Sequence, residues 1–209
     1  MRLNTEVKNL VVKINKEKGI IKRKIIIDHA KTQLLIHGVN SLSLRKISAE
    51  LGISHGNLHY YFKTKDNLLS AIFHEETIKL NKSISSSSDG TINLKDATMS
   101  LANTILVDVE ENQSLMNLFL VLIGESITNK KFADLIRKEN NLYDKVLENQ
   151  ILYINKNISK ERASYVAKII RYLVDGFCIE LIYADRNSKE FILFLVSLKE
   201  QICKLIIEA

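Results

Sequence analysis

Residues 43–72 constrain the fold more than any other stretch, because their apolar spacing and their breaks define very short helices. Ser43 stands where its side chain can cap a first helix, and Ile47 and Leu51, four residues apart, give that helix one apolar edge. Gly52 follows directly and can end the helix. The spacing therefore predicts a short helix between Ser43 and Gly52.

A second short helix is expected directly after this one. Ser54 can cap it, and Leu58 and Phe62 repeat the four-residue apolar spacing. The connecting turn, 52–54, has the length that joins the two helices of a helix-turn-helix. Its middle residue, Ile53, is apolar, as expected for a side chain between two helices. The pattern predicts a helix-turn-helix.

The outward side of this motif carries hydrogen-bond donors and aromatic rings. A helix that enters a groove of double-stranded DNA needs donors for phosphates and base edges, and no carboxylates on the contact side. No Asp or Glu occurs between Gly52 and Asp66. This composition favours DNA as the partner. The outward residues are Arg45, Lys46, His55, Gly56, Asn57, His59, Tyr60, Tyr61, Lys63 and Lys65.

The segment SHGNLHYYFKTKDNLL, residues 54–69, closely resembles the recognition-helix signature of TetR-family transcriptional regulators, and in particular of their multidrug-sensing branch. Upstream, IIDHA at 26–30 with Leu34 and Gly38 is similar to the family's first helix. The rest of the chain is similar in architecture alone. The resemblance implies an all-α protein with a three-helix helix-turn-helix headpiece and a larger helical domain for ligand binding and dimerisation.

The resemblance also implies roles for single residues. Arg45, His55, the backbone of Gly56 and His59 would face base edges or the groove floor. His55 and His59 depart from the commoner Lys and Tyr, which leaves the operator sequence open. The phosphate anchors would be Asn57, Tyr60, Tyr61, Lys63 and Lys65 with Ser43, and the predicted DNA-binding set also contains Lys46 and Ser54.

The composition agrees with a mostly helical protein. Of the 209 residues 46% are hydrophobic, and with no Pro and seven Gly few positions interrupt a helix. Up to Lys82 the chain has 15 Lys or Arg and seven Asp or Glu, whereas the remainder has 15 and 17. A basic amino-terminal part suits a polyanionic partner; a solvated basic surface is the alternative.

The cysteines and the hydropathy pattern bear on location. Cys178 and Cys203 occur in a chain without a secretory signal, so we expect two buried thiols and no disulfide framework. No run of about 18 apolar residues occurs, and charges are spread over the first positions. We expect a cytoplasmic protein without a membrane partner.

Three parts follow one another along the chain. Residues 1–19 form a basic extension, 20–65 the helix-turn-helix domain, and 66–209 the helical ligand-binding and dimerisation domain. The last part begins with a connector helix, 66–82, which Thr64 can cap. A Ser-rich loop is expected at 85–90, and further helices at 93–111, 113–127, 130–155, 159–186 and 188–207.

The basic extension has two interpretations. Val7, Leu10, Val11 and Ile14 share one helical face, which is typical of a short amphipathic helix, but the segment could also be a frayed arm. By the resemblance, such an extension can reach the neighbouring DNA groove. The alternative is a mobile tail that adds non-specific affinity.

The first main helix is expected at 20–37, ending at Gly38. Ile26, Ala30 and Leu34 form its inward line. By the resemblance, His29 and Gln33 stand where the family more often has small or apolar residues, so we expect different packing against the carboxy-terminal domain.

The last two predicted helices are too broadly apolar for a single core contact. Two such helices that pair with their symmetry mates would bury both stripes, as in the family's dimer. Gly176, in the middle of a helix, suggests a close helix approach. A monomer core of unusual width is the alternative. The predicted dimer interface consists of Leu173, Gly176, Phe191, Phe194, Leu195, Leu198 and Ile202.

A ligand cavity is expected between the middle helices, since small-molecule sites mix apolar and aromatic side chains with a few polar groups. The alternative for each residue is an ordinary core position. Asp175, an acid in an apolar stretch, should be either paired or placed to meet a cation. The predicted cavity residues are Leu106, Met116, Phe119, Leu120, Ile123, Tyr143, Leu147, Tyr172, Asp175 and Phe177.

The sequence gives little support for a metal site or for an enzymatic activity. His55 and His59 have a metal-compatible spacing, but no carboxylate or Cys lies near in sequence to complete a site. His74 begins a zincin-like HEE run, yet Ile78 replaces the second His. No nucleophile with a base and no phosphate-binding Gly loop occurs, so we expect no metal, no cofactor and no enzymatic activity.

The sequence thus predicts a homodimeric regulator that binds a palindromic operator in double-stranded DNA and is released by a small, mostly hydrophobic molecule. We expect a repressor, although the residues are also compatible with an activator. The rivals are a constitutive DNA-binding protein whose second domain only dimerises, and a helical enzyme.

Overall fold

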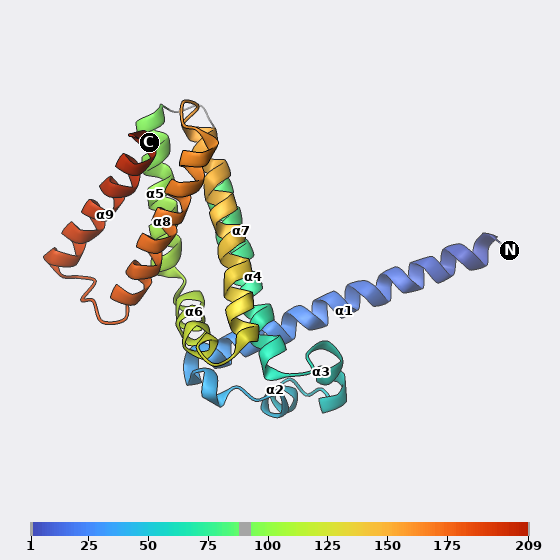
Figure 1. The fold of residues 1–209 in the computed structure, drawn as a ribbon. Helices are drawn as coiled ribbons and strands as arrows, with labels where there is room; N and C mark the ends of the chain where they lie inside the picture. Colours follow the sequence, from blue (N-terminus) through green and yellow to red (C-terminus); the bar gives the residue numbers. More distant parts are fainter. Residues whose placement is uncertain (1, 88–92, 209) are drawn as a thin grey trace. The chain divides into compact units, whose positions relative to one another are not determined.

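The computed structural model describes residues 2–87 and 93–208, with the backbone alone for residues 2–16, 113 and 114. Over these ranges it consists of nine α-helices and one 3-10 turn, without a β-strand, which confirms the all-α prediction (Figure 1). The elements are α1 (Arg2–His37), η1 (Val39–Ser41), α2 (Leu44–Glu50), α3 (His55–Tyr61), α4 (Lys65–Ser85), α5 (Leu94–Glu111), α6 (Gln113–Ser126), α7 (Lys130–Ile154), α8 (Lys160–Glu180) and α9 (Lys189–Ile207).

The chain divides into two compact units, Met1–Ile72 and Phe73–Ala209. The division falls inside α4, whose first residues belong to unit 1 and whose later residues belong to unit 2. The predicted Ser-rich loop extends beyond Ser87 into residues that the structure does not describe.

Unit 1 has a small core formed by α1 and the two helices of the helix-turn-helix. The predicted inward line of α1, Ile26, Ala30 and Leu34, is buried, which confirms this prediction. The backbone turns at Gly38 and Gly52 take φ values of 73° and 63°, which favour glycine because it has no Cβ. The other buried side chains of this core include Ile27, Leu42, Ile47, Leu58 and Phe62.

Helix α1 begins at Arg2, far before the predicted start near residue 20. The prediction placed the start after Gly19, but a single glycine costs a helix only about 1 kcal/mol and does not end it. The predicted apolar face at Val7, Leu10, Val11 and Ile14 concerns side chains outside the described residues.

The helices of unit 2 begin where short polar side chains cap them. Each cap accepts a hydrogen bond from a backbone N–H in the first turn, which satisfies a group that the helix itself leaves unpaired. The predicted breaks at 112 and 128–129 are confirmed in this way. The capping residues are Asn93, Asn112, Asn129, Ser159 and Ser188.

Helix α8 ends at Glu180 and not at the predicted residue 186. The guanidinium of Arg186 reaches back to the carbonyl oxygen of Leu181 at 3.5 Å and to that of Glu110 on α5 at 3.4 Å. These contacts satisfy backbone acceptors at the helix end and favour a turn there.

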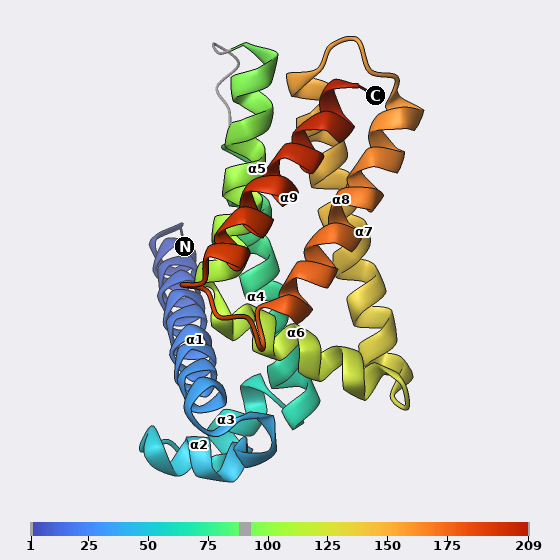
Figure 2. The ribbon, with the colours of Figure 1, turned by 90° about the vertical axis from the view of Figure 1, so that its left-hand side faces the viewer.

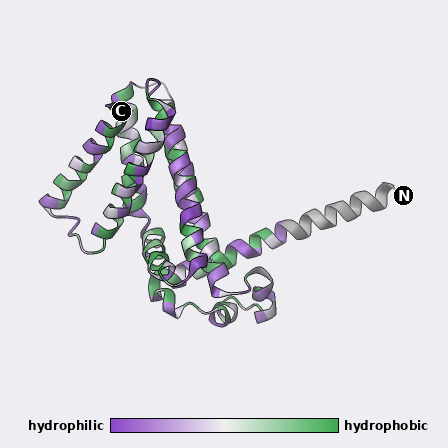
Figure 3. Ribbon diagram, viewed as in Figure 1, coloured by the Kyte–Doolittle hydropathy of each residue, from purple (hydrophilic) through white to green (hydrophobic). Residues whose placement is uncertain are grey.

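The core of unit 2 lies among α5, α7, α8 and α9. Helix α8 packs against α7, and α9 packs against α5 (Figure 2). Figure 3 shows α6 largely green and α7 largely purple, because α6 carries the apolar run LMNLFLVLI whereas α7 exposes charged residues on its outer side. Fully buried residues of this core include Leu101, Ile105, Leu147, Ile170, Phe177 and Ile202.

Within the described ranges, no helix combines the length with the apolar character needed to cross a bilayer.

Candidate functional site

Helices α2 and α3 form the predicted helix-turn-helix. The turn between them is closed by the N–H of Gly52, which donates to the Ala49 carbonyl at 3.2 Å, and by that of Ile53, which donates to the Ser48 carbonyl at 3.0 Å. The Ser54 hydroxyl accepts from the N–H of Asn57 at 3.1 Å and so caps α3 as predicted. Ser43 occupies the cap position of α2, but its side chain makes no capping hydrogen bond, so that part of the prediction is wrong.

The connector helix α4 has its predicted cap. The N–H of Asn67 donates to Thr64 Oγ1 at 3.1 Å. Because α3 ends at Tyr61 and α4 begins at Lys65, only a short link separates the two helices. The orientation of α3 is thereby tied to the first turn of α4.

Side chains of the predicted DNA-binding set lie at the surface. Tyr60 has 82% of its surface exposed, while Tyr61 and Lys65 are half-buried. The Tyr60 and Tyr61 rings meet edge to face with centroids 5.1 Å apart. The exposed remainder comprises Ser43, Arg45, Lys46, Ser54, His55, Gly56, Asn57, His59 and Lys63.

The two histidines of α3 lie side by side, with ring centroids 5.1 Å apart. In the part of the chain with described side chains, no three His, Cys, Asp or Glu residues gather in a way that could hold a metal ion. The histidines therefore add two adjacent imidazole rings to the outward face of α3, and they lie in the segment expected to select bases.

The carboxylate of Glu50, on α2, has two polar neighbours. His29 Nε2 lies 2.8 Å from one oxygen of Glu50, and Lys46 Nζ lies 3.8 Å from the other. His29 thus has a polar partner on α2. The ammonium of Lys46 offsets part of a negative charge that would repel phosphates.

A second candidate site is a cavity in unit 2 between α4, α5, α6, α7 and α8. The centre of a water-sized molecule can reach about 70 Å³ inside it. This space can hold a few groups of the size of a water molecule. Most of its wall is apolar. The lining residues are Phe73, Thr77, Leu80, Val109, Asn112, Leu115, Met116, Phe119, Glu139, Asn140, Tyr143, Arg171, Val174, Asp175 and Cys178.

Only part of the predicted cavity set lines this space. Met116, Phe119, Tyr143 and Asp175 do so. The prediction was wrong for the remaining six residues, because a sequence pattern shows that a helix face is apolar but not which neighbouring helix covers it. Leu106, Leu147 and Phe177 are buried in the core, Leu120 packs against that core, and Ile123 and Tyr172 are exposed.

Sequence reasoning missed the contribution of α4 and the polar members of α7 and α8. Phe73, Thr77 and Leu80 recur at helical spacing along one face of α4, a signal that was available. Arg171 stands four residues before Asp175, which is also a recognisable pair. Glu139 had no local signal, because its partners lie on another helix.

Two residues of the cavity lining, Arg171 and Asp175, belong to a group of three charged residues that also contains Asp144. Arg171 Nε donates to Asp144 Oδ1 at 2.7 Å, and Arg171 Nη1 donates to Asp175 Oδ2 at 3.2 Å. Burial raises the pKa of the Asp175 carboxyl, while the nearby guanidinium opposes that rise. Asp175 is therefore paired, which was one of the two alternatives expected for it, and it also lines the cavity.

A buried acid on α7 contacts α4. Glu139 accepts a hydrogen bond from the Thr77 hydroxyl at 2.8 Å, and its other oxygen lies 2.9 Å from His74 Nδ1. Only 3% of the Glu139 side chain is exposed. This acid therefore lines the cavity and at the same time holds two residues of α4.

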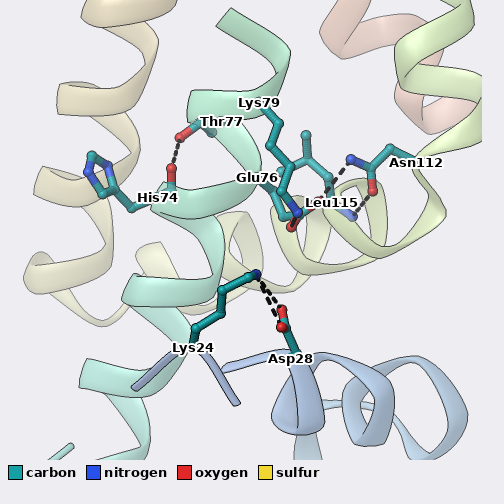
Figure 4. A network of polar contacts seen from close by, with 8 residues as sticks. All are labelled: Lys24, Asp28, His74, Glu76, Thr77, Lys79, Asn112 and Leu115. Carbon is teal, nitrogen blue, oxygen red and sulfur yellow. Dashed lines mark hydrogen bonds and ion pairs between the residues drawn. The ribbon is translucent and has the colours of Figure 1, made fainter. Parts of the chain in front are cut away.

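A further contact joins α4 to the start of α6 (Figure 4). Buried Glu76 accepts from Lys79 at 2.7 Å and from Asn112 Nδ2 at 3.0 Å, and Asn112 Oδ1 accepts from the Leu115 N–H at 3.2 Å. Asn112 and Leu115 also line the cavity, so α4 is tied to the cavity wall on this side as well.

The predicted dimer residues have mixed positions. Phe191, Leu198 and Ile202 are buried in the core of their own chain, so they cannot form an outward interface as predicted; the inner faces of α5 and α8 already cover them. Phe194 and Gly176 are exposed, and Leu173 and Leu195 are half-buried.

The described structure shows no close approach at Gly176, since a Cβ there would meet nothing within 4 Å. Its surroundings are nevertheless apolar. Exposed apolar residues on and after α8, and on α9, include Tyr172, Ile179, Ile182, Tyr183, Ile192, Leu193 and Val196.

Comparisons with known proteins bear on both sites. Residues 26–72 match the family model described as bacterial regulatory proteins, tetR family. No curated protein matches the chain significantly. Many solved structures are similar in fold, and three examples among them each cover 88% of this chain.

The first of these is a TetR transcription regulator from Haloarcula marismortui, with 20% identity, a TM-score of 0.69 and 95% of that chain covered. The second is a transcriptional regulator from Saccharomonospora viridis in complex with choline, with 17% identity, a TM-score of 0.67 and 95% covered. The third is AibR in complex with isovaleryl coenzyme A and operator DNA, with 13% identity, a TM-score of 0.57 and 96% covered.

The family match covers the helix-turn-helix, including all of α2 and α3, and the structural similarity extends through unit 2. The multidrug-sensing branch is not distinguished by these comparisons. Residues 26–72 are thus similar to the tetR family of bacterial regulatory proteins, and the chain has the all-helical fold of the TetR-type transcription regulators.

Proposed function

We propose that this protein is a homodimeric transcriptional repressor that binds a palindromic operator and leaves it when a small molecule enters the cavity of unit 2. The observation that carries the proposal is the outward face of α3, which presents donors and aromatic rings without a carboxylate. The proposed place of action is the cytoplasm.

On the DNA side, Arg45, His55, the Gly56 backbone and His59 are proposed to meet base edges. An Arg side chain can bind guanine with two parallel hydrogen bonds, and the tyrosine hydroxyls and lysines suit phosphates. The phosphate contacts are assigned to Ser43, Lys46, Ser54, Asn57, Tyr60, Tyr61, Lys63 and Lys65.

The dimer is proposed to form through the exposed apolar surface of α8 and α9. Tyr172, Ile179, Ile192 and Val196 expose 62%, 49%, 52% and 49% of their surface, which would favour burial against a second copy. A two-fold axis would then present two copies of α3 about 34–36 Å apart, the spacing of successive major grooves.

Ligand response is proposed to act through α4. Phe73, Thr77 and Leu80 line the cavity, and Glu139 contacts both His74 and Thr77. A ligand that changes these contacts biases α4, which continues back to the link after α3. Proteins of this fold have been crystallised with choline and with isovaleryl coenzyme A and operator DNA, which supports both parts of the proposal.

Selection of bound sequences from random DNA tests the DNA-binding part. We expect an inverted repeat whose half-sites lie about one helical turn apart, and a complex of two chains per operator. Enrichment of single half-sites, or of no sequence at all, would contradict the proposal.

Two substitutions then separate base contacts from phosphate contacts on the selected operator. Arg45→Ala should relax the base preference at one position by about 1–3 kcal/mol, whereas Lys63→Ala should weaken binding to all sequences and lower the salt dependence. The constitutive rival predicts an operator affinity that no cavity ligand changes.

A further inference from the structure

The cavity of unit 2 contains a polar atom that the protein leaves without a partner. The hydroxyl of Tyr143 is buried and makes no hydrogen bond to any residue that the structure describes, and Tyr143 as a whole is 8% exposed. A buried hydroxyl without a partner costs about 1–3 kcal/mol. Since Tyr143 lines the cavity, a group inside the cavity can supply the missing hydrogen bond.

The charges around this hydroxyl are negative in sum. Asp144 and Asp175 share one guanidinium, that of Arg171, whose shorter contact is to Asp144. Burial raises the pKa of the Tyr143 phenol, and the negative charge of Asp175 raises it further, so the phenol stays neutral close to that carboxylate. A net negative charge beside this hydroxyl favours the binding of a positively charged group in the cavity.

The other charged groups leave Asp175 as the available anion. Both oxygens of Glu139 have partners, His74 and Thr77. Arg171 is committed to two carboxylates, so it has little positive charge to offer an anionic ligand. Asp175, with a single contact at 3.2 Å, is the carboxylate of the lining that a ligand can approach most readily.

The remaining wall suits an apolar or aromatic body. The rings of Phe73 and Phe119 are stacked with centroids 6.3 Å apart, and Leu115, Met116 and Val174 line the same space. Aromatic faces also attract cations. The burial of the Cys178 thiol raises its pKa to about 12, so this residue adds a neutral group.

We propose that the cavity binds a small protonated amine with an apolar or aromatic body, whose N–H donates to Tyr143 Oη and whose charge is balanced by Asp175. The role of this amine as the effector rests on the proposed function. The proposed binding of the amine rests only on the residues that line the cavity.

Benzylammonium, benzyl alcohol and benzoate are matched probes, because they share a ring and differ in charge. Isothermal titration calorimetry of the full chain at pH 7 should show binding of benzylammonium at least about tenfold tighter than that of benzyl alcohol, and no binding of benzoate. Equal affinity for the alcohol, or tighter binding of benzoate, would overturn the proposal.

Two variants locate the contact. Tyr143→Phe should fold at least as stably as the wild type, because the lost hydroxyl has no protein partner, yet bind benzylammonium about tenfold more weakly. Asp175→Asn should abolish the preference for the amine over the alcohol. Asp134→Asn, on the same helix as Tyr143 but outside the cavity, is the control and should bind like the wild type.

Unchanged amine binding in both Tyr143→Phe and Asp175→Asn would overturn the assignment. Because Asp175→Asn removes a partner of Arg171, thermal unfolding checks its fold, and Tyr143→Phe gives an independent answer if that fold is lost.

Operator binding separates this proposal from the proposed function. If benzylammonium binds through Tyr143 and Asp175 but leaves operator affinity unchanged, the amine site stands and its effector role fails. If benzyl alcohol or benzoate instead binds and releases the operator, the ligand-responsive function stands and the amine assignment is overturned.

Discussion

The outward face of the helix-turn-helix and the cavity of unit 2 are built in opposite ways. The first comes from one short run of sequence, and its donors are exposed to solvent. The second is assembled from α4, α5, α6, α7 and α8, and its polar groups are largely buried and paired with one another. A surface of the first kind tolerates changes in single residues, whereas in the second kind Glu139 and Asp144 depend on partners from other helices.

This contrast has an energetic side. A solvated donor loses little when its neighbour changes, because water replaces the contact. A buried carboxylate that loses its partner keeps the full cost of its desolvation. Substitutions that remove one partner of a buried charged pair in the cavity should therefore affect stability, while those of exposed donors on the DNA-facing surface should affect binding.

The largest effect is expected for Arg171→Met. The change leaves Asp144 and Asp175 without their shared cation in a site where the Asp144 and Arg171 side chains are only 12% and 11% exposed. The free energy of unfolding should fall by about 3–5 kcal/mol, measured by urea denaturation followed by circular dichroism. Arg137→Met, which removes an exposed pair with Asp134, should cost less than about 0.5 kcal/mol, and equal costs for the two variants would break the comparison.

A smaller effect is expected at the turn of the helix-turn-helix. Gly52→Ala forces a Cβ onto a residue with φ of 63°, which should lower stability by about 1–2 kcal/mol in thermal unfolding. In Gly56→Ala the added Cβ would have no atom within 4 Å, and residue 56 has no positive φ. The stability of this variant should be equal to or higher than that of the wild type, while its operator affinity should be lower. A stable Gly52→Ala variant would show that this turn is not specified by its glycine.

The two cap positions of the motif should differ in the same assay. Ser54→Ala removes a capping hydrogen bond of 3.1 Å and should cost about 1 kcal/mol. Ser43→Ala removes no such bond and should stay within about 0.5 kcal/mol. Equal losses at both positions would mean that α2 is capped in solution by a contact absent from this structure.

The smallest effect is a pH dependence at Asp175. Burial raises the pKa of this carboxyl above its ordinary value of 3.8, so the unfolded chain releases the proton at lower pH than the folded chain does. The contribution of Asp175 to stability should thus be largest below that ordinary value and fall as pH rises through the raised one.

The melting temperatures of the wild type and Asp175→Asn, compared from pH 3.5 upward, isolate this contribution. The wild type should lose stability relative to the variant as pH rises. A difference that is constant with pH, or that grows in favour of the wild type, would contradict the raised pKa.

Some features of unit 2 were predictable from sequence. Asn112, Asn129 and Ser188 mark helix starts because a short polar side chain satisfies N–H groups within one turn. The end of α8 was not predictable, since Arg186 reaches a carbonyl on α5 that is 76 residues away in sequence.

The sequence by itself determined the helix-turn-helix, its caps at Ser54 and Thr64 and the types of side chain on α3, because these depend on interactions within a few residues. Only the tertiary structure decided which apolar faces point inward: Phe191, Leu198 and Ile202 enter the core, while Tyr172 faces solvent. It also decided that the Tyr143 hydroxyl lies in a cavity without a partner. The physical reason is that burial and pairing depend on neighbours brought from distant parts of the chain, which no local spacing encodes.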